Sequence, residues 1–307
     1  MPERIYSRVR RRVLMLVLPA MAAGCGDTPA GPDDPAPDAP LLIAFAHEVS
    51  QSRLRVGVVR SDGTQQRFVT DGTANASMPA WTPDGTQLTM SYQGTAGINP
   101  QLWTIGVDGS GLRPIPIGDR TGRSPSWSPG GEQLVFDDFY GLFVVKPDGS
   151  GLRALLTDEY DNGLPHWSPD GNWVLFTGFE PGFGQGAFRR LYVVRPDGSG
   201  LRRVASSVGG AIVKASWSPD GARIVFDASD GDLRIVTLAT DAVTRLMATT
   251  SVESWPSWSP DGTRIAFTRR VGAGSQIFTV RVDGSDEQQL TTGDGFYDYP
   301  TWRPMAR

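Results

Sequence analysis

The 307-residue chain has few of the side chains that most catalytic sites use, with one cysteine, Cys25, and two histidines, His47 and His166. A lone cysteine excludes an internal disulfide framework, so packing must stabilise the folded part. No group of His, Cys and carboxylate residues has the spacing of a metal site, and no Gly-x-Ser-x-Gly motif occurs. We therefore expect no cofactor and no bound metal. A non-catalytic protein is favoured, and an enzyme built on scattered carboxylates stays open.

Long stretches with the 3.6-residue period of an amphipathic helix are also missing. The chain instead has 37 Gly and 24 Pro among many Val, Ile, Thr and aromatic residues. This composition is typical of short strands joined by tight turns. We predict an all-β fold.

The first 25 residues differ from the rest of the chain. A basic segment from Arg4 to Arg12 precedes an apolar run from Val13 to Ala23, which is too short to span a bilayer comfortably. This layout predicts a secretory signal peptide over residues 1–24. The "AAGC" that ends at Cys25 resembles a bacterial lipobox, which implies lipidation of Cys25. An ordinary signal peptide cut nearby, with an incidental Cys25, is the alternative.

Residues 26–40 are rich in Pro, Ala and Asp, and they are predicted to form a solvated tether. Loss of the signal removes five Arg and one Glu and lowers the net charge from −4 to −8. This charge argues against a nucleic-acid partner, because such proteins usually carry a basic face. The expected parts are a signal peptide (1–24), a lipidated Cys25 with its tether (25–40) and a folded domain (41–307). The lipid would hold the protein on the exported side of a membrane, with the outer membrane favoured.

A repeat of about 44 residues organises the folded part. Variants of Trp-Ser-Pro-Asp-Gly begin at Trp81, Trp127, Trp167, Trp217 and Trp258, and a truncated Trp-Arg-Pro begins at Trp302. Ser-Pro-Asp-Gly suits a type I turn and hence a hairpin. Apolar residues stand seven and nine positions after the tryptophan, as at Leu88 and Met90, on one face of a strand. Two more strands follow, joined by an Asp-Gly turn, and this is the signature of a β-propeller blade.

The two ends of the repeat complement each other. Residues 41–46 have the apolar pair of a second strand, Ile43 and Phe45, but no tryptophan before it. Residues 297–304 are a first strand with no unit after it. We predict a six-bladed β-propeller of four-stranded antiparallel blades. It is closed by pairing of the C-terminal strand, about 297–304, with the N-terminal blade from Leu41.

The repeat resembles that of the TolB-type propellers of the WD-like class, also called PD40 repeats, over nearly the whole folded part. The resemblance implies six blades. TolB proteins carry an additional N-terminal α/β domain, whereas here we expect only a short tether before the propeller. The resemblance therefore implies the propeller and not a role in the Tol-Pal machinery.

Aspartates recur in the two turns of the repeat. A ring of carboxylates could bind a metal, but recurrence in almost every blade favours turn residues that accept local backbone hydrogen bonds. The repeated tryptophans are likewise expected to pack between blades. The predicted structural aspartates are Asp84, Asp170, Asp220 and Asp261 in the first turn and Asp108, Asp148, Asp197 and Asp283 in the second.

The uniform turns of an up-and-down blade lie on one face of the disc, and the variable loops lie on the other face, where binding concentrates. Aromatic and acidic residues recur in these variable loops, and they suit contacts with a peptide or a glycan. The candidate contact residues are Asp138, Tyr140, Glu159, Tyr160, Phe183, Trp255, Phe296, Tyr297 and Asp298.

Two functions fit these observations. The first is a membrane-anchored, exported, non-catalytic propeller that binds a protein or peptide in the bacterial envelope or acts there as a scaffold. The alternative is a glycan-binding or glycan-processing propeller, lyase-like or hydrolase-like, with its site on the variable face. Convergence of His166 with Asp138, Asp158 and Asp298 near the channel mouth would favour the alternative.

Overall fold

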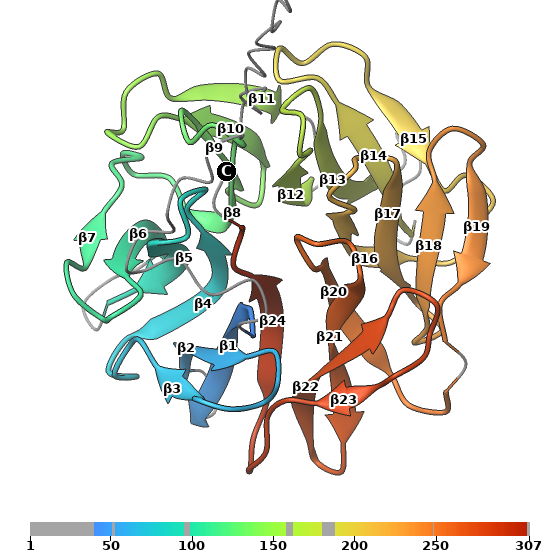
Figure 1. The fold of residues 1–307 in the computed structure, drawn as a ribbon. Helices are drawn as coiled ribbons and strands as arrows, with labels where there is room; N and C mark the ends of the chain where they lie inside the picture. The colour runs from blue at the N-terminus through green and yellow to red at the C-terminus, as the bar shows by residue number, and fades with distance from the viewer. Residues whose placement is uncertain are drawn as a thin grey trace, which may run out of the picture. The chain divides into compact units, whose positions relative to one another are not determined.

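The computed structural model describes residues 40–50, 53–94, 99–157, 162–179, 188–247 and 249–305. Within them the chain forms six four-stranded antiparallel sheets arranged as the blades of a propeller (Figure 1), so the predicted fold is confirmed. No helix among these residues is long and apolar enough to cross a membrane. The predicted signal peptide, Cys25 and nearly all of the predicted tether lie outside the described residues.

Five blades are continuous in sequence, and their strands follow in chain order. The first blade contains β4 (Asn75–Trp81), β5 (Gln87–Gln93), β6 (Gln101–Gly106) and β7 (Arg113–Pro114). The second contains β8 (Arg123–Trp127), β9 (Leu134–Asp137), β10 (Gly141–Val145) and β11 (Arg153–Thr157). The third contains β12 (Gly163–Trp167), β13 (Val174–Phe179), β14 (Arg189–Val194) and β15 (Arg202–Val204).

The next two blades have the same layout. The fourth contains β16 (Ile212–Trp217), β17 (Arg223–Ala228), β18 (Leu233–Thr237) and β19 (Ala242–Arg245). The fifth contains β20 (Glu253–Trp258), β21 (Arg264–Val271), β22 (Gly274–Arg281) and β23 (Gln288–Gln289). In each blade the strand that ends on the repeated tryptophan is the inner one.

The sixth blade joins the two ends of the described chain. It contains β24 (Tyr297–Trp302), β1 (Leu42–Ser50), β2 (Arg53–Arg60) and β3 (Arg67–Phe68), in that spatial order. β24 pairs antiparallel with β1, with Ile43 opposite Trp302 and His47 opposite Tyr297. The predicted closure of the ring is therefore confirmed.

A hydrophobic cluster fills the space between each pair of neighbouring blades. The repeated tryptophan and the two apolar residues after it face the preceding blade, as where Trp217, Ile224 and Phe226 pack against Leu191 and Val193. Burying one such side chain stabilises the fold by about 1.5–3 kcal/mol. The repeat therefore encodes the contacts between blades as well as the blades themselves.

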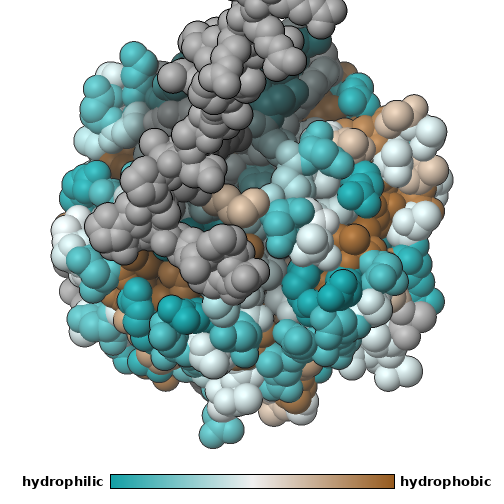
Figure 2. Space-filling model, viewed as in Figure 1, coloured by the Kyte–Doolittle hydropathy of each residue, from teal (hydrophilic) through white to brown (hydrophobic). Residues whose placement is uncertain are grey.

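The outer surface in view shows hydrophobic residues lying between hydrophilic ones (Figure 2). Apart from the neighbours Phe139 and Tyr140, the large apolar side chains that are exposed among the described residues are spread along the chain. Examples are Tyr140 between β9 and β10, Phe188 before β14, Leu201 before β15 and Val252 before β20. Single apolar side chains of this kind are ordinary on a soluble surface.

Two tyrosines test how much the closing strand contributes to stability. Tyr297 is 4% exposed, and its ring lies 5.6 Å from that of Phe45, whereas Tyr140 is 79% exposed. We expect Tyr297→Ala to lower the free energy of unfolding by about 3–5 kcal/mol, because it leaves a cavity in the closing blade. Tyr140→Ala should change it by less than about 0.5 kcal/mol. Denaturant unfolding of both variants measures this, and equal effects would contradict a stabilising role for the closing strand.

Candidate binding channel

Each inner strand carries a β-bulge just before its tryptophan. In the first blade the register between β4 and β5 slips between Ser77 and Ala80. In five blades the residue three positions before the tryptophan has a positive φ and precedes a proline. Proline has no N–H to give to the sheet ladder, so it is tolerated at such a bulge. The residues with positive φ are Met78, Ser124, Leu164, Trp255 and Tyr299.

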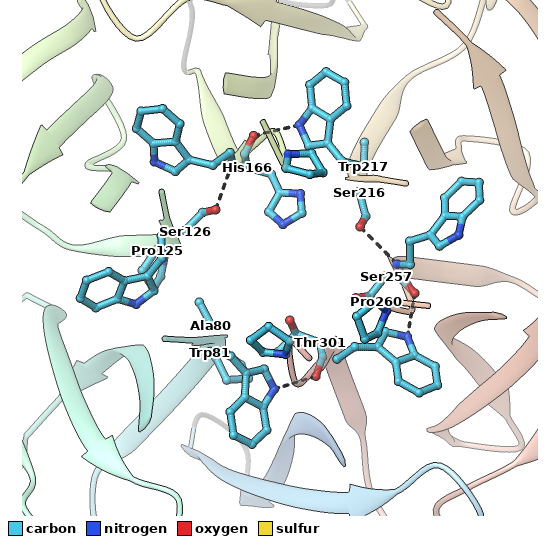
Figure 3. Close-up of a pocket in the computed structure, with 18 of the residues that line it drawn as sticks. Ala80, Trp81, Pro125, Ser126, His166, Ser216, Trp217, Ser257, Pro260 and Thr301 are labelled. Carbon is cyan, nitrogen blue, oxygen red and sulfur yellow. Dashed lines mark hydrogen bonds between the residues drawn. The ribbon is translucent and has the colours of Figure 1, made fainter. Parts of the chain in front are cut away.

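The six inner strands surround a central cavity of about 580 Å³ (Figure 3), which we refer to as the channel. Its lining comes from residues within three positions of each repeated tryptophan. Eleven of the 34 lining residues are prolines, and these offer no backbone N–H to a ligand. The tryptophan rings themselves point outward from the channel toward the blade interfaces.

The fourth blade breaks this pattern. β16 has Lys214 and Ala215 where the other inner strands have a residue of positive φ and a proline. Lys214 is the one Lys, Arg, Asp or Glu among the lining residues. Burial lowers the pKa of Lys214 to about 8, and the carboxylates of Asp137 and Asp227 oppose this shift. The channel therefore contains one amine that titrates close to neutral pH.

The buried Asp227 carboxylate holds two inner strands together. Its Oδ1 accepts the backbone N–H groups of Val213 (3.1 Å) and Lys214 (2.8 Å) on β16. Its Oδ2 accepts the N–H of Trp255 on β20 at 3.0 Å. Burial raises the pKa of Asp227, and these three N–H groups counteract the rise. Asp227 thus accepts hydrogen bonds from backbone N–H groups that the bulge leaves without a partner in the sheet.

Asp137 occupies the equivalent position in the second blade, at the end of β9. Its Oδ1 accepts the N–H of Leu164 on β12 at 3.3 Å, and its Oδ2 lies 3.8 Å from Arg123 Nε. Burial raises the pKa of Asp137, while the charges of Arg123 and Arg189 lower it. Both carboxylates behind the channel wall are therefore engaged by groups other than the Lys214 ammonium.

His166 faces the same cavity from β12, and its imidazole points into the channel (Figure 3). Its Nδ1 atom is buried and has no hydrogen-bond partner in the described part of the protein. Burial and the positive charge of Lys214 lower the pKa of His166 to about 3. The ring is therefore neutral at physiological pH, and it has one N–H donor to offer.

An aromatic pair lies in another part of the channel wall. Trp255 of the fifth blade and Tyr299 of the closing blade have ring centroids 4.3 Å apart. Burial raises the pKa of Tyr299, so its hydroxyl keeps its proton. The channel therefore combines proline and aromatic side chains with Ser and Thr hydroxyls, one amine, Lys214, and one imidazole, His166, the last two on adjacent blades.

The sequence pattern of the TolB beta propeller domain family (PD40) matches residues 35–198, which is more than half of the chain. The chain belongs to the TolB beta-propeller family. No curated protein sequence matches it.

Solved structures show the same fold. TolB from Acinetobacter baumannii is 22% identical with a TM-score of 0.72, and the match covers 86% of this chain and 67% of that one. A putative TolB from Agrobacterium tumefaciens is 17% identical with a TM-score of 0.65, covering 82% and 89%. A chain of a nidogen/laminin complex is 11% identical with a TM-score of 0.72, covering 87% and 99%.

The predicted contact residues of this TolB-family propeller lie in different environments. Asp138 is buried, and its carboxylate accepts a hydrogen bond from Arg120 Nη1 at 2.6 Å. Tyr140 is exposed at the turn between β9 and β10. Three further predicted contact residues, Glu159, Tyr160 and Phe183, lie outside the described residues.

Two predicted contact residues are not on exposed loops. Tyr297 is the first residue of β24, and its ring packs against Phe45 and His47, so the expected exposed position is contradicted. Burial lowers the pKa of His47. Trp255 belongs to β20 and lines the channel, although we expected it in a crossover loop. The sequence around Trp255 resembles that of a loop, but these residues form a β-bulge within a strand.

The last two predicted contact residues are half-buried. Phe296 lies beneath the guanidinium of Arg270, 5.1 Å from the ring centroid. The carboxylate of Asp298 accepts a hydrogen bond from Ser275 Oγ at 3.2 Å, and burial raises its pKa. No group of three or more His, Cys, Asp or Glu residues in the described ranges could hold a metal ion. Asp158, one of the carboxylates whose convergence with His166 would favour the glycan alternative, lies outside these ranges.

The repeated turn aspartates accept local hydrogen bonds. Asp84 accepts the hydroxyl of Thr82 and the backbone N–H of Thr86. In the second turn Asp108 accepts the N–H of Ser110 at 2.9 Å, and bonds from this residue hold its pKa below the usual range. The same bond from the residue two positions on is present at Asp148, Asp170, Asp197, Asp220, Asp261 and Asp283.

Sequence reasoning missed Lys214, Asp137 and Asp227. The signal for Lys214 was present, because five blades read x-Pro-x-Trp at the end of the inner strand and residues 213–217 read Val-Lys-Ala-Ser-Trp. The two aspartates had no such signal, since each also accepts a hydrogen bond from the next blade, from Leu164 to Asp137 and from Trp255 to Asp227.

Lys214 and Lys146 are the two lysines of the chain, and Lys146 is exposed in a turn. We expect the acetylation rate of Lys214 to rise with a midpoint near pH 8, with Lys146 as the reference in the same sample. Asp227→Asn should move the midpoint lower, because the carboxylate favours the charged amine. The control Asp84→Asn should leave it in place. An unchanged midpoint in Asp227→Asn would contradict this electrostatic link.

Proposed function

We propose that this protein is a non-catalytic propeller of the bacterial envelope, and that its channel binds a peptide segment of a partner protein. The size and the lining of the channel are the observations that support this proposal. A cavity of about 580 Å³ has the size of a ligand pocket, and its lining combines prolines and aromatic residues with Ser and Thr hydroxyls, Lys214 and His166. This moves the expected contact from the variable face to the axis, and Tyr140 stays a candidate contact at the rim.

The channel lining suits an extended peptide. Its prolines and bulged strands are rigid, so little conformational entropy is lost when a ligand orders against them. Aromatic rings such as Trp255 and Tyr299 supply contact area at low entropic cost. A peptide would gain most of its affinity from these walls and its orientation from Lys214 and His166.

The family supports a protein partner. This chain belongs to the TolB propeller family, and one structural neighbour is a chain of a nidogen/laminin complex, which is an assembly of two proteins. The glycan-processing alternative has less support. It needs carboxylates at the reacting bond, and the lining contains no Asp or Glu.

A substitution that fills the channel tests the proposal. Ala80 lines the channel at the position that His166 occupies in its own blade, and Ala154 lies exposed on the outer strand β11. Peptides would be selected from a random display library on the detergent-solubilised full chain, and their affinities measured by fluorescence anisotropy. Ala80→Tyr should weaken binding by at least about tenfold, because a tyrosine ring takes the space of ligand side chains.

The matched control is Ala154→Tyr, which adds the same ring away from the channel and should bind like the wild type. Equal binding by the wild type and Ala80→Tyr would show that the peptides bind elsewhere, and the channel would lose its proposed role.

We also propose that a lipid on Cys25 anchors the protein on the exported side of the membrane, the outer membrane being favoured. Cys25→Ser should abolish incorporation of labelled palmitate and move the protein from the membrane fraction to the soluble fraction, because two acyl chains give stable anchoring. Retention of the variant in the membrane fraction would contradict the lipid anchor.

A further inference from the structure

The channel carries a positive charge that the structure leaves without a direct partner. Of the 29 Lys and Arg residues only two are lysines, and one of them, Lys214, lines the channel. In the part of the chain that the structure describes, its ammonium forms no hydrogen bond or ion pair. An ammonium has three N–H donors and is costly to bury without acceptors.

The nearby carboxylates do not take this role. Asp227 uses both oxygens to accept three backbone N–H groups. Asp137 accepts the N–H of Leu164 and has the guanidinium groups of Arg123 and Arg189 as its positive neighbours. Both carboxylates therefore have hydrogen-bond partners other than the Lys214 ammonium. Lys214 itself lines the channel.

His166 adds a second polar group beside Lys214. It stands on β12, which packs next to β16, and its neutral imidazole points into the same space (Figure 3). Its buried Nδ1 atom has no partner among the described residues. A ligand with two oxygens could accept a hydrogen bond from the ammonium and one from the imidazole N–H. A carboxylate has this form and the opposite charge.

We propose that Lys214 and His166 anchor a carboxylate of the segment that the channel binds. The proposal rests on the proposed peptide-binding function and specifies its ligand. The carboxylate belongs either to an Asp or Glu side chain or to the C-terminus of the partner, since both present the same two oxygens. Lys214 supplies the charge and His166 sets the orientation.

The first experiment uses small carboxylates and does not depend on any peptide. Trace acetylation of the full chain at pH 8 would be measured by mass spectrometry as the ratio of Lys214 to Lys146 labelling. N-acetylglycine represents a C-terminal carboxylate and N-acetylaspartate amide a side-chain one, with acetamide and sodium chloride as neutral and ionic controls. Carboxylates should slow labelling of Lys214 by about threefold or more by masking its amine. Equal protection by acetamide or chloride would overturn the proposal.

The second experiment uses the peptides that bind the wild type and fail to bind Ala80→Tyr. Each is made with its free C-terminus, with an amidated C-terminus, and with Asn or Gln replacing Asp or Glu. Lys214→Gln should weaken the carboxylate-bearing forms by about tenfold or more, while Lys214→Arg keeps most of the affinity, because only Arg retains the charge. The amidated and Asn or Gln forms show which carboxylate is bound.

Affinity for the carboxylate-bearing forms should also fall as the pH rises through about 8. His166 of β12 stays neutral there, so the fall comes from loss of the Lys214 charge. Burial raises the pKa of Asp137 of β9 and of Asp227 of β17, and any ionisation of these carboxyls acts in the same direction. Peptides that fail to bind Ala80→Tyr could still bind Lys214→Gln with the same affinity as the wild type. That result would overturn the carboxylate anchor and leave the peptide-binding function intact. Peptides insensitive to Ala80→Tyr would overturn the peptide-binding function itself.

Discussion

The packing of a repeated tryptophan against the preceding blade is the contact on which the ring depends. At three of the six blades the indole N–H also donates a hydrogen bond to the inner strand of the preceding blade. The indole N–H of Trp217 donates to the carbonyl of His166 at 3.1 Å, and that of Trp302 donates to Ser257 at 3.0 Å. The bond from Trp81 to Thr301 at 3.0 Å joins the first blade to the closing strand. The tryptophan ring packs in the hydrophobic interface at every blade, so one residue type sets the spacing of the blades.

This repeated contact explains why the channel is uniform where it follows the repeat. The tryptophans are committed to the blade interfaces, and the prolines beside them remove backbone donors, so most of the wall offers apolar surface. Other polar chemistry enters at Lys214 on β16, where the repeat fails, and at His166 on β12, which occupies the variable position before the tryptophan. Because the scaffold tolerates a change at one blade without altering the other five, a binding site can be placed there at little cost to the fold.

The sequence predicted the blades, their turns and the closure of the ring, because hydrophobic period and turn chemistry act over a few residues. The candidate site was predicted less well. Residues around Trp255 and Tyr297 had the glycines, prolines and aromatics of a binding loop, yet they form bulged inner strands. The proline that marks a loop elsewhere is accommodated here by the bulge, so its local signal was misleading.

The sequence by itself determined the architecture, since each 44-residue unit carries its own strands, turns and interface residues. Only the tertiary structure decided which side chains share the channel. Lys214, Asp137 and His166 come from three blades, and they act on one another because ring closure brings the inner strands together around one axis. Charges separated by so many residues interact only after the chain has folded, and their burial then sets the pKa of Lys214.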